Sequence, residues 1–110
     1  MTAALEDLKE RLRRFAAARD WERFHTPKNL SMALTAEAAE LVAHFQWLKE
    51  GEAVATAALP EIEQELADVL IYLVRLADRL DVDLLDAVER KMAINAQRFP
   101  PAGQSEPETG

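Results

Sequence analysis

The chain of 110 residues contains no cysteine, which excludes disulfide bonds and thiolate metal sites. A sequence without cysteine fits a reducing compartment, and we expect the protein in the cytoplasm. No apolar run reaches the roughly 18 residues that span a membrane. The N-terminal segment is charged and lacks the apolar core of a secretory signal peptide. We therefore expect no membrane partner.

Glycine and basic residues are also scarce. The sequence has three glycines, and two of them, Gly103 and Gly110, lie near the C-terminus. Lysine and arginine number 13 against 20 acids, which gives a net charge of −7. A protein that follows a nucleic-acid backbone needs a basic face, so we expect no nucleic-acid partner. A small phosphorylated ligand is not excluded, because a bound cation would reverse the local field.

The spacing of apolar residues predicts an all-α fold, because it follows a helical period and strict alternation is not sustained anywhere. Thr26 and Pro27 suit the N-cap and first position of a helix, with Asn29 as a rival N-cap. Pro100 ends the last helix. We expect four helices, at residues 3–18, 26–48, 60–80 and 83–99.

These helices define one domain over residues 1–100, followed by a disordered tail at residues 101–110 that is rich in Pro, Gly, Ser and Glu. Residues 69–74 are apolar around the whole circumference of the third helix. Such a helix is buried on all sides. Because a four-helix monomer of this size has too little material to cover it, we expect oligomerisation to complete the bundle.

Two pairs of acidic residues are the strongest functional feature of the sequence: Glu37 with Glu40, and Glu65 with Asp68. No lysine or arginine occurs between residues 29 and 48, and Asp68 is the only charge in residues 66–74. An unpaired carboxylate in apolar surroundings is costly, so it must protonate, find a partner or bind a metal.

The spacing within each pair favours a shared cation. Residues three apart on a helix are surface neighbours, and Glu37 continues the apolar stripe of Leu30, Leu34 and Leu41. Two facing helices would therefore bring four carboxylates together. A cluster of oxygen ligands suits Mg²⁺, with Mn²⁺ as the alternative, and indicates phosphate chemistry. The competing interpretation is a solvated acidic face.

Several aromatic residues are candidates for contact with a nucleobase. Trp21 and His25 lie in the turn before the second helix, and Trp47 lies near the end of that helix. Their rings could stack on a base, or pack in the core instead. Tyr72 follows Asp68 by one helical turn and could carry a hydrogen bond into the site, or lie at an interface.

Lys91, Asn95 and Arg98 share one face of the fourth helix. The two cations could neutralise a polyphosphate, although a solvated basic stripe would look the same. His44 has no role that the sequence suggests, and we expect it to be exposed.

Four stretches of the sequence resemble the MazG-like all-α nucleotide pyrophosphohydrolases, and in particular their dCTP pyrophosphatase branch. The resemblance covers residues 12–100, and its motifs occur in the family's order. The stretches are RDWERFHTPKNL (19–30), EAAELVAHFQW (37–47), QELADVLIYLVRLA (64–77) and KMAINAQRFP (91–100).

The resemblance implies Mg²⁺-dependent hydrolysis of a nucleoside triphosphate, with dCTP or a related pyrimidine favoured, to the monophosphate and pyrophosphate. It implies dimers or tetramers with sites near subunit boundaries, and we favour a homotetramer. By position, the metal ligands and catalytic residues are Glu37, Glu40, Glu65 and Asp68; the base and sugar pocket includes His25, Asn29 and Trp47, with Trp21 nearby; the phosphate contacts are Lys91, Asn95 and Arg98.

Three alternatives remain open at this point. The enzyme could prefer another pyrimidine triphosphate or a damaged nucleotide. The chain could instead be a nucleotide-sensing or scaffolding helical oligomer with little catalysis. It could also be a purely structural oligomer, which predicts no rise in melting temperature when Mg²⁺ is added.

Overall fold

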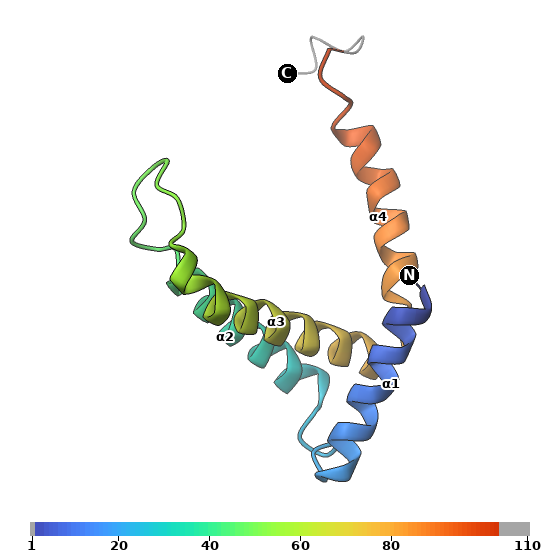
Figure 1. Ribbon diagram of the computed structural model, residues 1–110. Coiled ribbons are helices and arrows are strands. Elements are labelled where there is room, and N and C mark those ends of the chain that lie inside the picture. Colours follow the sequence, from blue (N-terminus) through green and yellow to red (C-terminus); the bar gives the residue numbers. More distant parts are fainter. Residues whose placement is uncertain (1, 104–110) are drawn as a thin grey trace.

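The computed structural model describes residues 2–103, and within this range the regular structure is entirely helical (Figure 1). The all-α class and the four long helices expected from the sequence are confirmed. None of the described helices is both long and apolar enough to cross a membrane. The elements in order are α1 (Thr2–Ala18), α2 (Pro27–Ala43), the short 3-10 helix η1 (Thr56–Ala58), α3 (Leu59–Arg79) and α4 (Leu84–Arg98).

Helices α2 and α3 lie side by side and antiparallel, and they form the centre of the molecule (Figure 1). The N-cap of α2 is Thr26, whose side chain accepts a hydrogen bond from the Asn29 amide at 3.1 Å. Leu30, in the first turn of α2, is fully buried. The loop between the two helices contains Gly51 with a φ of +78°, a conformation that glycine adopts without strain.

Helix α2 ends at Ala43, earlier than the expected residue 48. The next residues form a tightened turn, in which the His44 amide donates to the Leu41 carbonyl and the Phe45 amide donates to the Val42 carbonyl. Helices in proteins are stabilised mainly by packing of an apolar face. Trp47 is 85% exposed, so the segment beyond residue 43 lacks that packing and leaves the helical conformation.

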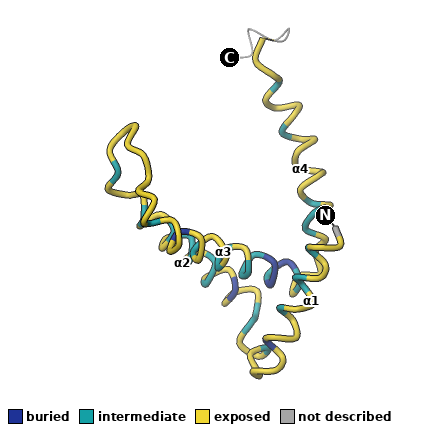
Figure 2. The backbone as a smooth tube through the Cα atoms, viewed as in Figure 1, coloured by how far each residue is buried: buried dark blue, intermediate teal, exposed yellow. Residues whose placement is uncertain are grey.

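Helix α1 packs against the C-terminal end of α3 (Figure 1). Its Ala16 is buried, and Arg13 forms a two-bond ion pair with Asp78 of α3, with its shorter contact at 2.7 Å. Buried residues concentrate where α1, α2 and α3 meet (Figure 2). This junction is the small core of the chain and one wall of the site described below.

Helix α4 extends away from the other three helices (Figure 1). It starts as expected, with Asp83 as N-cap accepting from the Asp86 amide at 3.0 Å. Its apolar residues Met92 and Ile94 are 61% and 51% exposed. On α3, Leu70 is 44% exposed in the single chain although Val74 is buried. Burial of the 69–74 segment on all sides, and the oligomer that would achieve it, stay predictions.

The expected domain limit at residue 100 also stays a prediction. Residues 101–103 are exposed and lack helical structure. The rest of the expected disordered tail lies outside the described residues.

Candidate active site

Three of the four predicted metal-binding carboxylates converge in the structure. Glu37 comes from α2, and Glu65 and Asp68 come from α3. One carboxylate oxygen from each lies within 4.8 Å of the others. This arrangement follows from the antiparallel pairing of the helices, because Glu65 and Asp68 are three residues apart on one face of α3. Three carboxylate oxygens so close together can bind one hard divalent cation, whereas carboxylates that are separately solvated have no reason to converge.

Glu37 carries the clearest sign of electrostatic stress in this acidic cluster. Its Oε1 atom is buried and has no hydrogen-bond partner among residues 2–103. The pKa of Glu37 is raised, first by burial and then by the charges of Glu40, Asp68 and Glu65. A carboxylate in this condition favours either a proton or a cation. The orphaned oxygen and the all-oxygen donor set therefore fit Mg²⁺ or Mn²⁺.

Glu40 does not join the cluster in this structure, although it follows Glu37 by one helical turn. Its side chain is exposed, whereas the other three acids are partly buried. It is nevertheless near enough to raise the pKa of Glu37 more than Asp68 or Glu65 does. Glu40 thus occupies the solvent side of the acidic cluster.

His44 is partly buried, so the expectation of an exposed side chain is wrong. Its Nε2 atom lies 3.5 Å from Oε2 of Glu65, and each of the two side chains is 19% exposed. The turn after α2 brings the ring over α3, where Glu65 is 21 positions further along the chain. The sequence contains only a partial signal for this position: His44 follows Glu37 by two helical turns and so falls on the same side as the acidic stripe.

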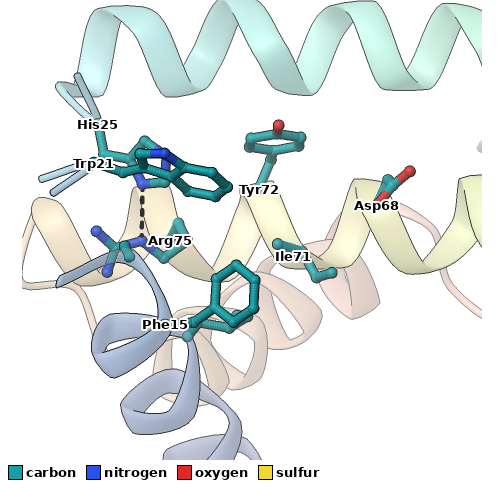
Figure 3. Close-up of a pocket in the computed structure, with 9 residues that line it drawn as sticks. Phe15, Trp21, His25, Asp68, Ile71, Tyr72 and Arg75 are labelled. Atoms are coloured by element: carbon teal, nitrogen blue, oxygen red, sulfur yellow. Dashed lines mark hydrogen bonds between the residues drawn. The ribbon is translucent and has the colours of Figure 1, made fainter. Parts of the chain in front are cut away.

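A pocket of about 270 Å³ begins at Asp68 and runs along α3 toward the turn before α2 (Figure 3). Trp21 and His25 stand at its far end, and their ring centroids are 5.9 Å apart. Because Asp68 belongs to both features, the acidic cluster and the pocket form one continuous site. The lining residues are Leu12, Phe15, Ala16, Trp21, His25, Asp68, Ile71, Tyr72 and Arg75.

Arg75 is a pocket residue that the sequence analysis missed. Its side chain is 2% exposed, and it donates to His25 Nδ1 at 3.3 Å, to Asp78 at 3.2 Å and to Glu22 at 3.1 Å. A signal for it exists in the sequence, since Asp68, Tyr72 and Arg75 are spaced to share one face of α3. The ion pairs with Glu22 and Asp78 explain how a charged residue is buried there.

The other predicted contact residues lie outside this pocket in the single chain. The Asn29 side chain donates to the Phe24 carbonyl at 3.0 Å and so braces the turn that carries His25. Trp47 is almost fully exposed. Lys91, Asn95 and Arg98 lie on α4, which points away from the site (Figure 1). One copy of the chain places Trp21, His25 and Tyr72 in the pocket that adjoins the acidic cluster, and it leaves these five residues outside that pocket.

Comparisons with known proteins agree on one family. The family model described as the MazG-like family matches residues 32–109. The dCTP pyrophosphatases 1 of Rattus norvegicus and Homo sapiens are each 49% identical over 100 residues, covering 87% of this chain. The chain spans 59% of the length of these relatives. A pyrophosphatase of known structure from Archaeoglobus fulgidus is 40% identical, with a TM-score of 0.83 over 89% of this chain and 94% of that one.

Proposed function

Since the chain belongs to the MazG-like family, we propose that it hydrolyses a nucleoside triphosphate to the monophosphate and pyrophosphate. The observation that carries the proposal is the continuity of the acidic cluster with an aromatic pocket through Asp68. We propose dCTP or a related pyrimidine deoxynucleotide as substrate, supported by the two relatives that are named dCTP pyrophosphatase 1. The proposed place of action is the cytoplasm.

Glu37, Glu65 and Asp68 would hold a divalent cation, Mg²⁺ in the first place and Mn²⁺ as the alternative. Such a cation would supply charge neutralisation at the triphosphate. We propose that the Glu40 carboxylate completes a set of four oxygens, since its charge is close enough to raise the pKa of Glu37. The assignment is supported by the buried Glu37 Oε1 atom, which has no hydrogen-bond partner among the described residues and would gain one interaction from a bound cation.

Glu40 is our choice of general base, because its exposed carboxylate can hold a water molecule at the solvent side of the acidic cluster. The attacking water gives its proton to Glu40 while its oxygen bonds to the α-phosphorus. The bond from the α-phosphorus to the bridging oxygen breaks, and pyrophosphate leaves with that oxygen. The aromatic pocket excludes water from the nucleoside side of the reacting bond.

The nucleoside would occupy the pocket between Trp21 and Tyr72. Its lining is mostly apolar, and indole and phenol rings offer stacking surfaces for a base. The Tyr72 hydroxyl can carry a hydrogen bond toward the acidic cluster, one turn away. His25 supplies a polar atom at the far end, and Asn29 supports it by holding the turn that bears it.

The predicted contact residues that lie far from the pocket in one chain would reach the pocket of a neighbouring copy in an oligomer. We propose a homotetramer, rather than a dimer, in which α4 presents Lys91, Asn95 and Arg98 to the phosphates of a bound nucleotide. Trp47 would likewise cover the base in the assembly. Two observations support a partner on these surfaces: α4 projects from the chain, and its apolar side chains are exposed.

A direct test measures pyrophosphate release by the purified chain with Mg²⁺ and each of the common deoxynucleoside triphosphates. We expect release to be fastest with dCTP and to disappear in Glu65→Gln. Glu63→Gln is the matched control, because it removes the same charge from an exposed position of α3. Nucleotide binding without release by the wild-type chain would favour the sensing or scaffolding alternative.

A further inference from the structure

Arg75 is the most completely buried large side chain of the pocket. Burying a guanidinium is costly unless its N–H groups have partners. Two partners are acids: Nη2 donates to Glu22 and Nη1 to Asp78, and these contacts hold the guanidinium in place. The third partner is not an acid but the His25 ring, to which Arg75 donates through Nε.

The Nε atom of arginine carries a hydrogen and has no lone pair to offer, so it can act only as a donor. The ring nitrogen that faces it, Nδ1 of His25, must therefore accept and cannot carry a hydrogen. The remaining hydrogen of a neutral imidazole then resides on Nε2. A doubly protonated ring would place two N–H groups against each other beside a buried cation.

The surroundings of His25 act in the same direction. The pKa of His25 is lowered, first by burial and then by the Arg75 charge. Arg79 also lowers this pKa, and Glu22 opposes the effect. The neutral ring is therefore the form that the pocket holds at neutral pH.

We infer that Arg75 is a positioning residue that fixes His25 as its Nε2–H tautomer, so that the far end of the pocket presents a hydrogen-bond donor to an acceptor oxygen of the nucleoside. His25 lines the pocket, and within residues 2–103 its hydrogen bond to Arg75 uses Nδ1 and none uses Nε2. The identity of the ligand rests on the proposed function, whereas the tautomer does not. An acceptor oxygen could be a base carbonyl or a sugar hydroxyl.

The tautomer is measured in the full-length, nucleotide-free chain by nitrogen-15 NMR of the histidine side chains. The spectrum contains two histidines, and the signals that vanish in His25→Gln belong to His25. We expect Nδ1 at a shift typical of an unprotonated ring nitrogen and Nε2 at a shift typical of N–H. Reversed or averaged shifts in the wild-type chain would overturn the inference. The variant serves only for assignment, the tautomer is read in the wild-type chain, and no turnover is required.

Arg75→Met tests the positioning role, with dCMP as the probe of nucleoside binding. We expect averaged His25 shifts and about tenfold weaker dCMP binding, the loss of roughly one oriented hydrogen bond. Arg79→Met is the matched control, because Arg79 also binds Glu22, at 2.9 Å, but does not donate to His25. A folded Arg75→Met chain with unchanged tautomer and dCMP affinity would refute the role.

The source of the acceptor oxygen is separated by comparing dCMP with 2′,3′-dideoxycytidine monophosphate. If the wild-type chain prefers dCMP and Arg75→Met does not, the donor binds the sugar hydroxyl. If both chains show the same preference, the base carbonyl is the acceptor. A chain that shows the expected tautomer but no pyrophosphate release would refute the proposed function and leave the Arg75 assignment standing.

Discussion

Replacing Glu37 with glutamine should make the metal-free protein more stable. The substitution keeps the size of the side chain and removes a charge that faces Glu40, Asp68 and Glu65. A buried polar group without a partner costs about 1–3 kcal/mol. An amide still needs partners, so we expect a gain at the lower end, about 1 kcal/mol. For a chain of this length that gain raises the melting temperature by roughly 4 °C.

The pH dependence of this gain has a definite sign. Because the pKa of Glu37 is raised, the folded protein binds this proton more tightly than the unfolded chain does. The free energy of unfolding therefore falls as the pH rises from the ordinary value of 4.5 through the raised pKa. The advantage of Glu37→Gln should be complete above the raised pKa, should shrink as the pH falls through that pKa, and should be smallest at and below pH 4.5.

Adding Mg²⁺ should reverse the order of the melting temperatures of the wild type and Glu37→Gln. A ligand at 100 times its dissociation constant stabilises the folded state by about 2.7 kcal/mol, which corresponds to roughly 10 °C here. Only the wild-type chain has the complete set of acidic ligands, so it should gain most of this shift. Glu37→Gln should gain little and end below the wild type.

Thermal melts followed by circular dichroism, in EDTA and in millimolar MgCl₂, test both parts. Glu63→Gln serves as the control for the general effect of removing one negative charge from an acidic protein. Its melting curves should follow those of the wild type in both buffers. A Glu37→Gln protein that melts below the wild type in EDTA, or a wild type indifferent to Mg²⁺ and Mn²⁺, would contradict the reasoning about the acidic cluster.

Three further predictions concern other parts of the chain. Asp78→Asn should lose about 2 kcal/mol at neutral pH in urea denaturation. The bond from Arg13 lowers the pKa of Asp78, so this contribution is present above pH 3.8 and fades as the pH falls through the lowered value; an unchanged difference in acid would refute it. Trp21→Ala should raise KM for dCTP about tenfold with a smaller change in kcat, since base stacking contributes about 1–3 kcal/mol; an unchanged KM would place the base elsewhere. In sedimentation the chain should behave as a tetramer, and a monomer would contradict the proposed assembly.

Local chemistry explains which parts of the fold the sequence predicted well. Thr26 and Asp83 are N-caps because their side-chain oxygens satisfy free amides within a few residues, a relation that the sequence contains in full. The end of α2 was misplaced because it depends on what Trp47 packs against, and packing partners are distant in sequence. What packs against the apolar face of α4 is likewise not contained in the local sequence.

In the candidate site, too, some residues were identifiable from the local sequence and others depend on contacts with distant segments. Asp68 was identifiable as the single acid of an apolar stretch, and Glu65 as the acid three residues before it. Arg75 was not identified, because its burial depends on Glu22, 53 positions away, and on a ring from another segment. His44 was misjudged for the same reason: its neighbour Glu65 belongs to a different helix.

Helix α3 carries Asp68 at one end of the pocket and Arg75 at the other, without a break between them. With a rise of about 1.5 Å per residue, it holds the two positions about 10 Å apart along its axis. The helix thus fixes the separation between the acidic cluster and the far end of the pocket. Inserting one alanine within residues 69–74 would rotate Asp68 relative to Arg75 by about 100° around the helix axis. Both ends would remain, but a nucleotide bound as proposed could no longer contact both of them.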